Sequence, residues 1–187
     1  MPHPVEPLPC EPHPAEPGPG AAAERTAGTA RLDLLPLRVE HAEEMAEALS
    51  DPALHVFIGG APHTAQGLRS RYERLVAGSP DPAVRWRNWV LRERAGGRLV
   101  GTVQATVSGE VAEVAWVVGT PWQGRGYAVE AARALVRHVI RAYPVRTVVA
   151  HVHPGHHASA AVAAAAGLTA TDTLQDGEVR WELTVRR

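Results

Sequence analysis

Two spacings of hydrophobic residues alternate along the chain and predict strands and helices in turn. A strand is predicted over 99–107, because residues 102–107 alternate between polar and apolar side chains, which is typical of a half-buried strand. Residues 111–118 are almost continuously apolar, which predicts a strand covered on both faces in the middle of a sheet. Further strands are expected at about 30–37, 86–93, 146–152, 168–174 and 179–185.

Apolar residues three and four positions apart predict helices between these strands. The longest is expected over about 124–143, and its apolar stripe consists of Val129, Ala132, Leu135, Val136, Val139 and Ile140. Shorter helices are expected at 39–50, between Thr64 and Gly78, and at 157–166. Strand 111–118, helix 124–143 and strand 146–152 would form a right-handed parallel crossover. The predicted fold class is α/β, with a mixed central sheet flanked by helices.

The first 29 residues have a different composition, because they hold 8 of the 16 prolines. Proline removes a backbone donor and favours extended geometry in the residue before it, so neither helix nor sheet is expected there. We predict a disordered, proline-rich tail over 1–29 and a single domain over 30–187. Docking of the tail to a partner is the alternative. The tail lacks the basic start and apolar stretch of a secretory signal.

Composition and charge remove several classes of function. All 19 basic residues are arginine, which excludes Schiff-base lysines and the lysine of phosphate-binding loops. The net charge of −1 argues against nucleic-acid binding, and there is no run of 18 apolar residues for a membrane. Cys10 is the only cysteine, so intramolecular disulfides are excluded. We therefore expect a cytoplasmic protein with no nucleic-acid or membrane partner.

The most informative segment is 117–128, where a buried strand ends, a Gly/Pro loop follows and the long helix begins. Unpaired N–H groups at a helix start bind anions, and small residues allow a phosphate to approach the backbone. A dinucleotide-binding fingerprint is disfavoured because Val129 occupies the third small-residue position. A glycine turn needed only for packing is the second alternative. A pyrophosphate cradle of another kind is the interpretation we favour.

This segment resembles a known family. Residues 123–128, Gln-Gly-Arg-Gly-Tyr-Ala, match the Gln/Arg-x-x-Gly-x-Gly/Ala signature of the GNAT N-acetyltransferases. The resemblance covers about residues 30–185 and recurs at Pro154, Ser159 and Gly167. Residues 35–38 and 50–55 resemble the branch that acetylates the N-termini of ribosomal proteins. The resemblance implies the acyl-CoA N-acyltransferase fold and transfer of an acetyl group from acetyl-CoA, with no metal, to a primary amine by direct attack.

The same resemblance implies a set of site residues. The pyrophosphate of acetyl-CoA would be bound by Gln123, Gly124, Arg125, Gly126, Tyr127 and Ala128. Backbone groups around Val117 and Val118 would polarise the thioester carbonyl. His156 stands where the family has an asparagine that ties the cofactor arm. Many members protonate the thiolate with a tyrosine, but Ala163 stands there, so Ser159 is expected to be the acid.

Several groups are candidates for the base that accepts the proton of the amine. Glu113 is the only ionisable residue within 111–118, and a buried carboxylate there would serve as a base. Its alternative is a structural ion pair with an arginine such as Arg87. The histidines at 151, 153, 156 and 157 form a cluster for which we weigh a metal site, surface or capping roles, and an alternative base.

The acceptor is also left open. A protein N-terminus and a small-molecule amine both fit, and its pocket is expected between the loop 55–63 and the hairpin near Asp176. These loops carry no dense acidic cluster, which argues against a polycationic acceptor. A non-catalytic acyl-CoA sensor of the same fold is the rival function, and the chain is expected to be a monomer or a homodimer.

Overall fold

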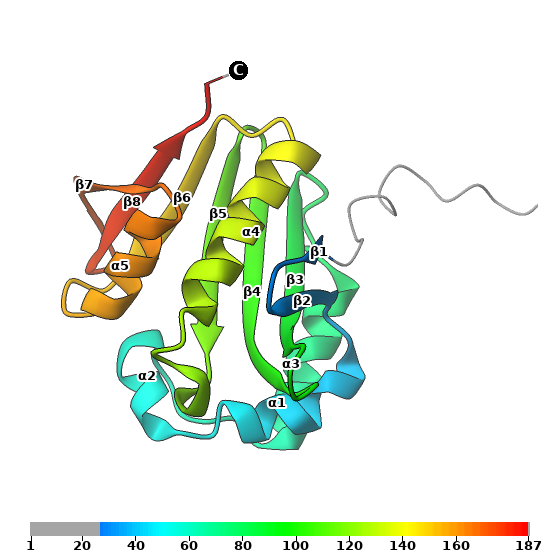
Figure 1. Cartoon of the computed structure of the whole chain (residues 1–187). Coiled ribbons are helices and arrows are strands. Elements are labelled where there is room, and N and C mark those ends of the chain that lie inside the picture. The colour runs from blue at the N-terminus through cyan, green and yellow to red at the C-terminus, as the bar shows by residue number, and fades with distance from the viewer. Residues whose placement is uncertain (1–26, 187) are drawn as a thin grey trace, which may run out of the picture.

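A computed structural model describes residues 27–186 of the chain (Figure 1). Within that range eight strands form one sheet in the order β1-β2-β3-β4-β5-β6-β8-β7. The strands are β1 (Ala27–Gly28), β2 (Leu32–Pro36), β3 (Val84–Glu93), β4 (Leu99–Ser108), β5 (Val111–Val118), β6 (Thr147–Val152), β7 (Thr169–Gln175) and β8 (Glu178–Thr184). The helices are α1 (Ala42–Ala48), α2 (Pro52–Ile58), α3 (Ala65–Ala77), α4 (Tyr127–Ala142) and α5 (His157–Ala165), with 3-10 turns η2 (Val39–His41) and η3 (Thr120–Trp122).

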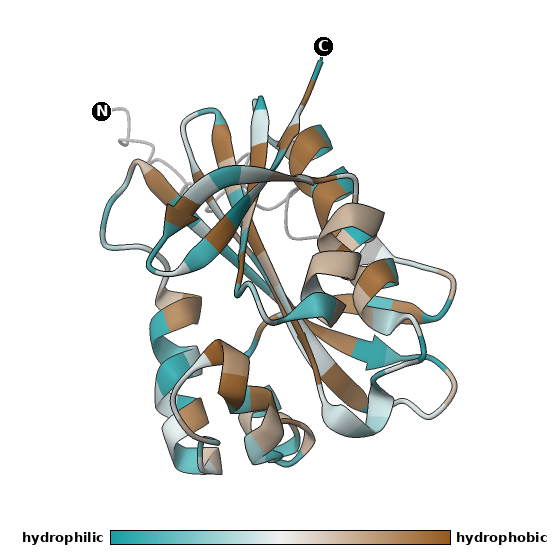
Figure 2. Ribbon diagram, turned by 90° about the vertical axis from the view of Figure 1, so that its left-hand side faces the viewer, coloured by the Kyte–Doolittle hydropathy of each residue, from teal (hydrophilic) through white to brown (hydrophobic). Residues whose placement is uncertain are grey.

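The predicted fold class is confirmed, since a mixed sheet lies between two layers of helices (Figure 2). Neighbouring strands pair antiparallel except β5 and β6, which pair in parallel. Helix α4 connects these two strands in the sequence. The start of the sheet differs from the prediction, because Ala27 and Gly28 pair with β2 as β1. The sheet therefore begins inside the predicted tail, whose residues 1–26 lie outside the described part of the chain.

Two helices also differ from the prediction. The sequence pattern predicts no helix over 52–58, yet α2 forms there because its start is well capped. The Asp51 side chain accepts a hydrogen bond of 2.8 Å from the Ala53 amide, and Pro52 occupies the first helical position. Helix α4 begins at Tyr127 rather than at 124, because the preceding glycines adopt left-handed backbone angles that a helix does not continue.

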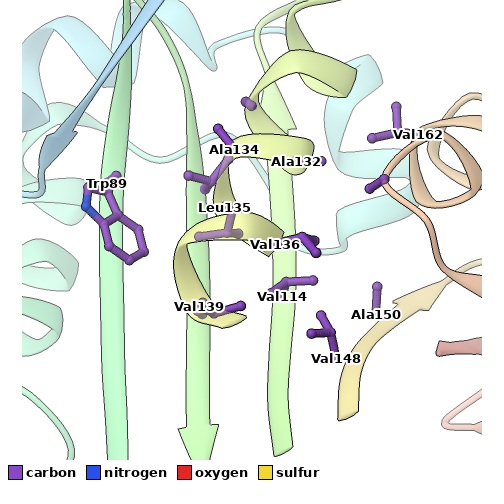
Figure 3. Close-up of a cluster of buried hydrophobic side chains, with 14 of the residues drawn as sticks. Trp89, Val114, Ala132, Ala134, Leu135, Val136, Val139, Val148, Ala150 and Val162 are labelled. Atoms are coloured by element: carbon purple, nitrogen blue, oxygen red, sulfur yellow. The ribbon is translucent and has the colours of Figure 1, made fainter. Parts of the chain in front are cut away.

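The core has one cluster on each face of the sheet. Helix α4 covers the first face, where Leu135 and Val139 belong to the same buried cluster as side chains of β3, β5 and β6 (Figure 3). Helices α1 and α3 cover part of the second face, where Met45 and Leu68 pack with Val90. We call these the α4 face and the α1/α3 face. In the described residues no helix is both long and apolar enough to cross a membrane.

The sheet is split along its only parallel pair. Residues Val111, Ala112 and Glu113 of β5 pair with Thr147, Val148 and Val149 of β6, and the pairing then stops. β5 continues to Val118 alongside β4, while β6 continues alongside β8. Figure 1 shows β6, β8, β7 and α5 separating from β5 towards the end of the sheet where α2 lies. We call this opening the fork.

Burial of α4 makes its central leucine a sensitive test of the core. Leu135 is 0% exposed, so truncating it removes apolar contacts and leaves a cavity. We expect Leu135→Ala to lower the free energy of unfolding by about 2–5 kcal/mol in urea titrations. Leu174→Ala is the matched control, because Leu174 is 65% exposed on β7. Equal losses in the two variants would contradict the assignment of the core.

Candidate active site at the fork between β5 and β6

The glycine turn at the start of α4 has the geometry that anion binding requires. Gly124 and Gly126 have φ angles of 72° and 79°, which disfavour any residue with a side chain. Gly126 is the N-cap of α4, so the first amides of the helix follow it directly. These N–H groups lack carbonyl partners within the helix and lie at its positive dipole end. A Cβ atom on Gly124 would meet nothing within 4 Å, so the backbone there is open to a ligand.

Gln123 and Tyr127 fix the shape of this loop rather than reach outwards. Gln123 Nε2 donates to the Val118 carbonyl at 3.0 Å, which ties the loop to the end of β5. The Tyr127 hydroxyl donates to Glu93 at 3.2 Å, and its ring is buried in the core. Arg125 has an exposed side chain. Of the predicted residues, Tyr127 can therefore offer a ligand its backbone amide, while its side chain points elsewhere.

A second support of the loop was missed by the sequence interpretation. Arg31 donates to the Arg125 carbonyl at 2.8 Å, pairs with Glu130 at 2.7 Å and lies 4.9 Å above the Tyr127 ring. Burial opposes the charge of Glu130, but hydrogen bonds from Thr29 and Arg31 outweigh it and hold the pKa of the carboxyl below its usual value. These contacts join residues about 100 positions apart, so no local motif marks them.

The backbone of β5 places one of the two predicted amides in the fork. The Gly119 amide donates to the Val100 carbonyl at 2.8 Å, and the β4–β5 register is regular. Hydrogen-bonded pairs alternate along an antiparallel ladder, so Val117 points its amide at β4 while Val118 points its amide away from it. Opposite Val118 the pairing with β6 has ended. The Val118 N–H therefore faces the fork, and that of Val117 does not.

Ser159 lies on the opposite side of the fork, in the first turns of α5. Its Oγ accepts a hydrogen bond of 3.2 Å from Nε1 of Trp116, a residue of β5. An indole only donates, so the hydroxyl hydrogen of Ser159 stays available for another acceptor. The two sides of the fork are thus joined by one hydrogen bond that also sets the position of the hydroxyl.

Two cavities meet at this bond. One, of about 440 Å³, lies between the glycine turn, α2 and α5 and is lined by Gly124, Gly126 and Ala128. The other, of about 400 Å³, lies over the α1/α3 face and is lined by residues of α1, α3 and β3 to β6. Both cavities share the wall residues Phe57, Ile58, Trp116, Val117, His156 and Ser159. We call them the glycine-turn cavity and the front cavity.

Helix α2 contributes the wall between the cavities through Phe57. Its ring stacks on His156 with centroids 4.2 Å apart and an interplanar angle of 19°. Burial of the ring, and secondarily the charge of a protonated His153, hold the pKa of His156 below its usual value. His156 is the N-cap residue of α5 but makes no side-chain capping bond. Its neutral ring is therefore a packing surface at the junction of the two cavities.

The structure corrects the expected environment of Glu113. The side chain is 57% exposed rather than buried, because it points from β5 into the front cavity. Its neighbour is His151, whose Nδ1 lies 3.5 Å from Oε1, and not Arg87. Arg87 instead donates to the Tyr143 hydroxyl at 2.7 Å, at the end of α4. Register explains the difference, since residues 113 and 87 lie on opposite faces of the sheet.

The four clustered histidines separate in space. His151 lies on β6, its side chain only 10% exposed. His153 accepts a hydrogen bond of 3.0 Å from the Gly155 amide. His156 stacks on Phe57, and His157 is exposed at the first position of α5. Residues 27–186 contain no group of three His, Cys, Asp or Glu side chains placed to hold a metal ion.

A sheet that forks beside a glycine turn at a helix start is the arrangement expected of an acyltransferase that uses a coenzyme A thioester. Residues 31–169 match the family model described as "Acetyltransferase (GNAT) domain". The chain therefore belongs to the GNAT family and is an acetyl-CoA-dependent acyltransferase. The family predicted from the sequence is confirmed.

Similar proteins include enzymes that act on different acceptors. The chain is 28% identical to the FsC-acetyl coenzyme A-N(2)-transacetylase of Aspergillus fumigatus, over 87% of this chain and 77% of that protein. A Salmonella typhimurium acetyltransferase that modifies the N-terminal serine of a 50S ribosomal subunit protein superposes with a TM-score of 0.70 at 14% identity, covering 84% and 97% of the two chains. An aminoglycoside acetyltransferase in complex with coenzyme A gives 0.67 at 18% identity, covering 82% and 94%.

The lowered pKa of His156 makes the Phe57 stack sensitive to pH. Because the folded pKa lies below 6.5, the stability that the neutral ring contributes is fully present above pH 6.5 and is lost as the pH falls through the folded pKa. We expect His156→Gln to be less stable than the wild type near neutral pH, with the two melting temperatures converging as the pH falls below 6.5. His157→Gln, an exposed neighbour, should follow the wild type. A difference that stays constant with pH would contradict this role.

Proposed function

We propose that this acyltransferase transfers an acetyl group directly from acetyl-CoA in the glycine-turn cavity to a primary amine in the front cavity. The observation that carries this proposal is the meeting of the two cavities at Trp116, Val117 and Ser159. Direct attack requires both reactants to be held together at short distance, which needs two binding spaces that open onto one point. A single cleft closed at β5 would offer the thioester no acceptor.

The residues of the glycine-turn cavity fit a CoA thioester. The first amides of α4, with those of the turn before it, supply donors for the pyrophosphate, and the open space over Gly124 admits it. The Val118 amide, which has no partner in β6, is directed at the place where a pantetheine arm would run along β5. An amide fixed in this way donates to the carbonyl oxygen as negative charge develops there.

Ser159 is suited to protonate the departing thiolate. Trp116 occupies an acceptor position on its Oγ and leaves the hydroxyl hydrogen free. Ser159 also lines both cavities, as a group that serves the leaving sulfur on one side and the amine on the other must do. Ala163 cannot take this role, because its methyl side chain has no proton to donate and is buried on the inner side of α5.

The lining of the front cavity indicates the kind of amine that it accepts. The only carboxylates among its lining residues are Glu113 and Glu178, which is few for a polycationic acceptor. We therefore infer an acceptor with one reactive amine. A peptide N-terminus and a compact small-molecule amine both meet this description.

Binding of the cofactor can be tested at Gly124. Valine at its φ of 72° is strained and would place a side chain in the glycine-turn cavity. We expect Gly124→Val to weaken CoA binding by about 10-fold or more in calorimetry, because the added methyl groups prevent close approach of the pyrophosphate. Gly97→Val is the matched control, since its φ is 71° and its Cβ also meets nothing within 4 Å. Equal binding by the two variants would count against the cradle.

The role of Ser159 can be separated from binding. We expect Ser159→Ala to lower kcat by about 10–100-fold in a thiol-release assay, because proton transfer to the thiolate is lost. The dissociation constant for CoA should stay within about 2-fold, since the hydroxyl is a minor part of the binding surface. Ser108→Ala, at the exposed end of β4, is the control. Wild-type protein that binds CoA and releases no thiol with any amine would indicate a sensor instead.

A further inference from the structure

We propose that the acceptor carries an anionic group, a carboxylate or a phosphate, as well as its amine, and that Arg71 binds this group in the front cavity. The inference rests on the proposed function and names the class of acceptor for the same site. The amine and the anion would lie at opposite sides of the cavity. The acceptor would therefore be a zwitterion.

Arg71 occupies a position of α3 that faces the front cavity. One face of this helix lines the cavity with residues spaced three and four positions apart, which are Leu68, Arg71, Tyr72 and Leu75. Leu68 and Tyr72 are buried, as expected for the inner face of a helix. Arg71 is exposed, so a ligand in the cavity can contact its side chain. The apolar stripe of α3 is thus interrupted by one permanent positive charge.

The described residues provide no counter-ion for this charge. Within 27–186 Arg71 forms no ion pair or hydrogen bond, whereas Arg69 on the same helix pairs with Glu43 at 3.2 Å. The positions of α3 that adjoin Arg71, three and four residues away, contain no acid, since they hold Gly67, Leu68, Arg74 and Leu75. Burial raises the pKa of Tyr72 to about 12 against the opposing charge of Arg71, so the phenol stays neutral.

The carboxylates of the cavity lie on its other side. Helix α3 packs over β3, because Leu68 and Tyr72 belong to the same buried cluster as Val90. Glu113 lies on β5, two strands further along the sheet, and Glu178 begins β8, beyond β6. Neighbouring strands are about 4.8 Å apart, which separates β3 from β5 by about 10 Å.

This separation of charge orients a zwitterion. An ammonium group is attracted to the side of the cavity that holds Glu113, and β5 also carries Trp116, the partner of Ser159. Figure 1 shows α3 beside β3 and α5, the helix of Ser159, beside β6 and β8. An anion on the same molecule would then be directed towards α3. The amine therefore faces the thioester when the anion contacts Arg71.

The floor between these two sides is polar. Asn88 of β3 is paired with Gln104 of β4, which is paired in turn with Ala115 of β5. Paired residues point to the same face of a sheet, and all three line the front cavity. The side chains of Asn88 and Gln104 form no hydrogen bond with another of the described residues. Their amide groups are therefore available for a polar segment, such as a peptide group, between the amine and the anion.

The remaining titratable groups of the front cavity do not oppose an anion beside α3. They are all histidines, at positions 55, 63, 151, 153 and 156. An imidazole is neutral or positive, so none of them repels a carboxylate or a phosphate. Only Glu113 and Glu178 would do so, and both belong to strands on the other side of the cavity.

The test compares acceptors that differ in one charged group. Alanyl-glutamate amide and alanyl-glutamine amide form a pair for the carboxylate, and alanyl-phosphoserine amide and alanyl-serine amide form a pair for the phosphate. In a thiol-release assay of the full chain, we expect kcat/KM to be about 10-fold or more higher for the anionic member of at least one pair, because a charge-assisted contact with Arg71 is gained. The pair that shows the preference distinguishes the two anions.

Variants of α3 assign the preference to one side chain. Arg71→Gln should raise KM for the anionic acceptor by about 10–100-fold, and the loss should appear in KM rather than in kcat, since the guanidinium binds away from the reacting atoms. Arg71→Lys should keep part of the preference, because the charge remains and the bidentate fork is lost. Arg74→Gln is the matched control, since Arg74 lies on the same helix and lines neither cavity.

Several outcomes would overturn the inference. Equal kcat/KM for the two members of both pairs would do so, and so would turnover of neutral amines alone. A preference for the anionic member that persists in Arg71→Gln would show that another group binds the anion. Wild-type protein that binds CoA in calorimetry but acetylates no amine, charged or neutral, would instead refute the proposed function, and the inference would fall with it.

Discussion

The site depends on the point at which β5 and β6 stop pairing. After Glu113 and Val149 the two strands follow different neighbours, since β4 holds the rest of β5 and β8 holds the rest of β6. The backbone groups of β5 that a continuous sheet would satisfy are thereby directed into open space. Unpaired backbone groups in a protein interior are costly, so the fork is a place where a ligand with matching polar groups replaces the missing strand.

Keeping the fork open requires rigid supports on both sides. Helix α4 spans the α4 face, and its buried residues Leu135 and Val139 share a cluster with side chains from both β5 and β6. The glycine turn before α4 is held in turn by Gln123 and by the Arg31–Glu130 pair. Helix α2 closes the far end through the contact of Phe57 with His156. Loosening of any one support would move the backbone donors relative to Ser159 on α5.

The sequence predicts those parts of the molecule that short segments determine. Periodicity was sufficient for the sheet, α4 and the crossover, because each is a continuous pattern of burial. The glycine turn was recognisable because its residues are consecutive. Helix α2 was missed because its residues show no clear helical spacing of apolar side chains. Its start is determined by the cap that Asp51 provides. The exposure of Glu113 and its contact with His151 depend on the register of a strand pair that joins residues 38 positions apart, which no spacing reveals.

This difference explains why the cofactor was easier to predict than the acceptor. The glycine-turn cavity is lined by residues of the segment 116–129, the first turns of α5 and helix α2. The front cavity instead collects side chains from α1, α2, α3 and five strands. A protein can therefore change its acceptor by replacing scattered residues while the glycine turn stays the same. The chemistry of the acceptor must accordingly be derived from the groups that the fold brings together, such as the Glu113 carboxylate and the His151 ring, rather than from any motif.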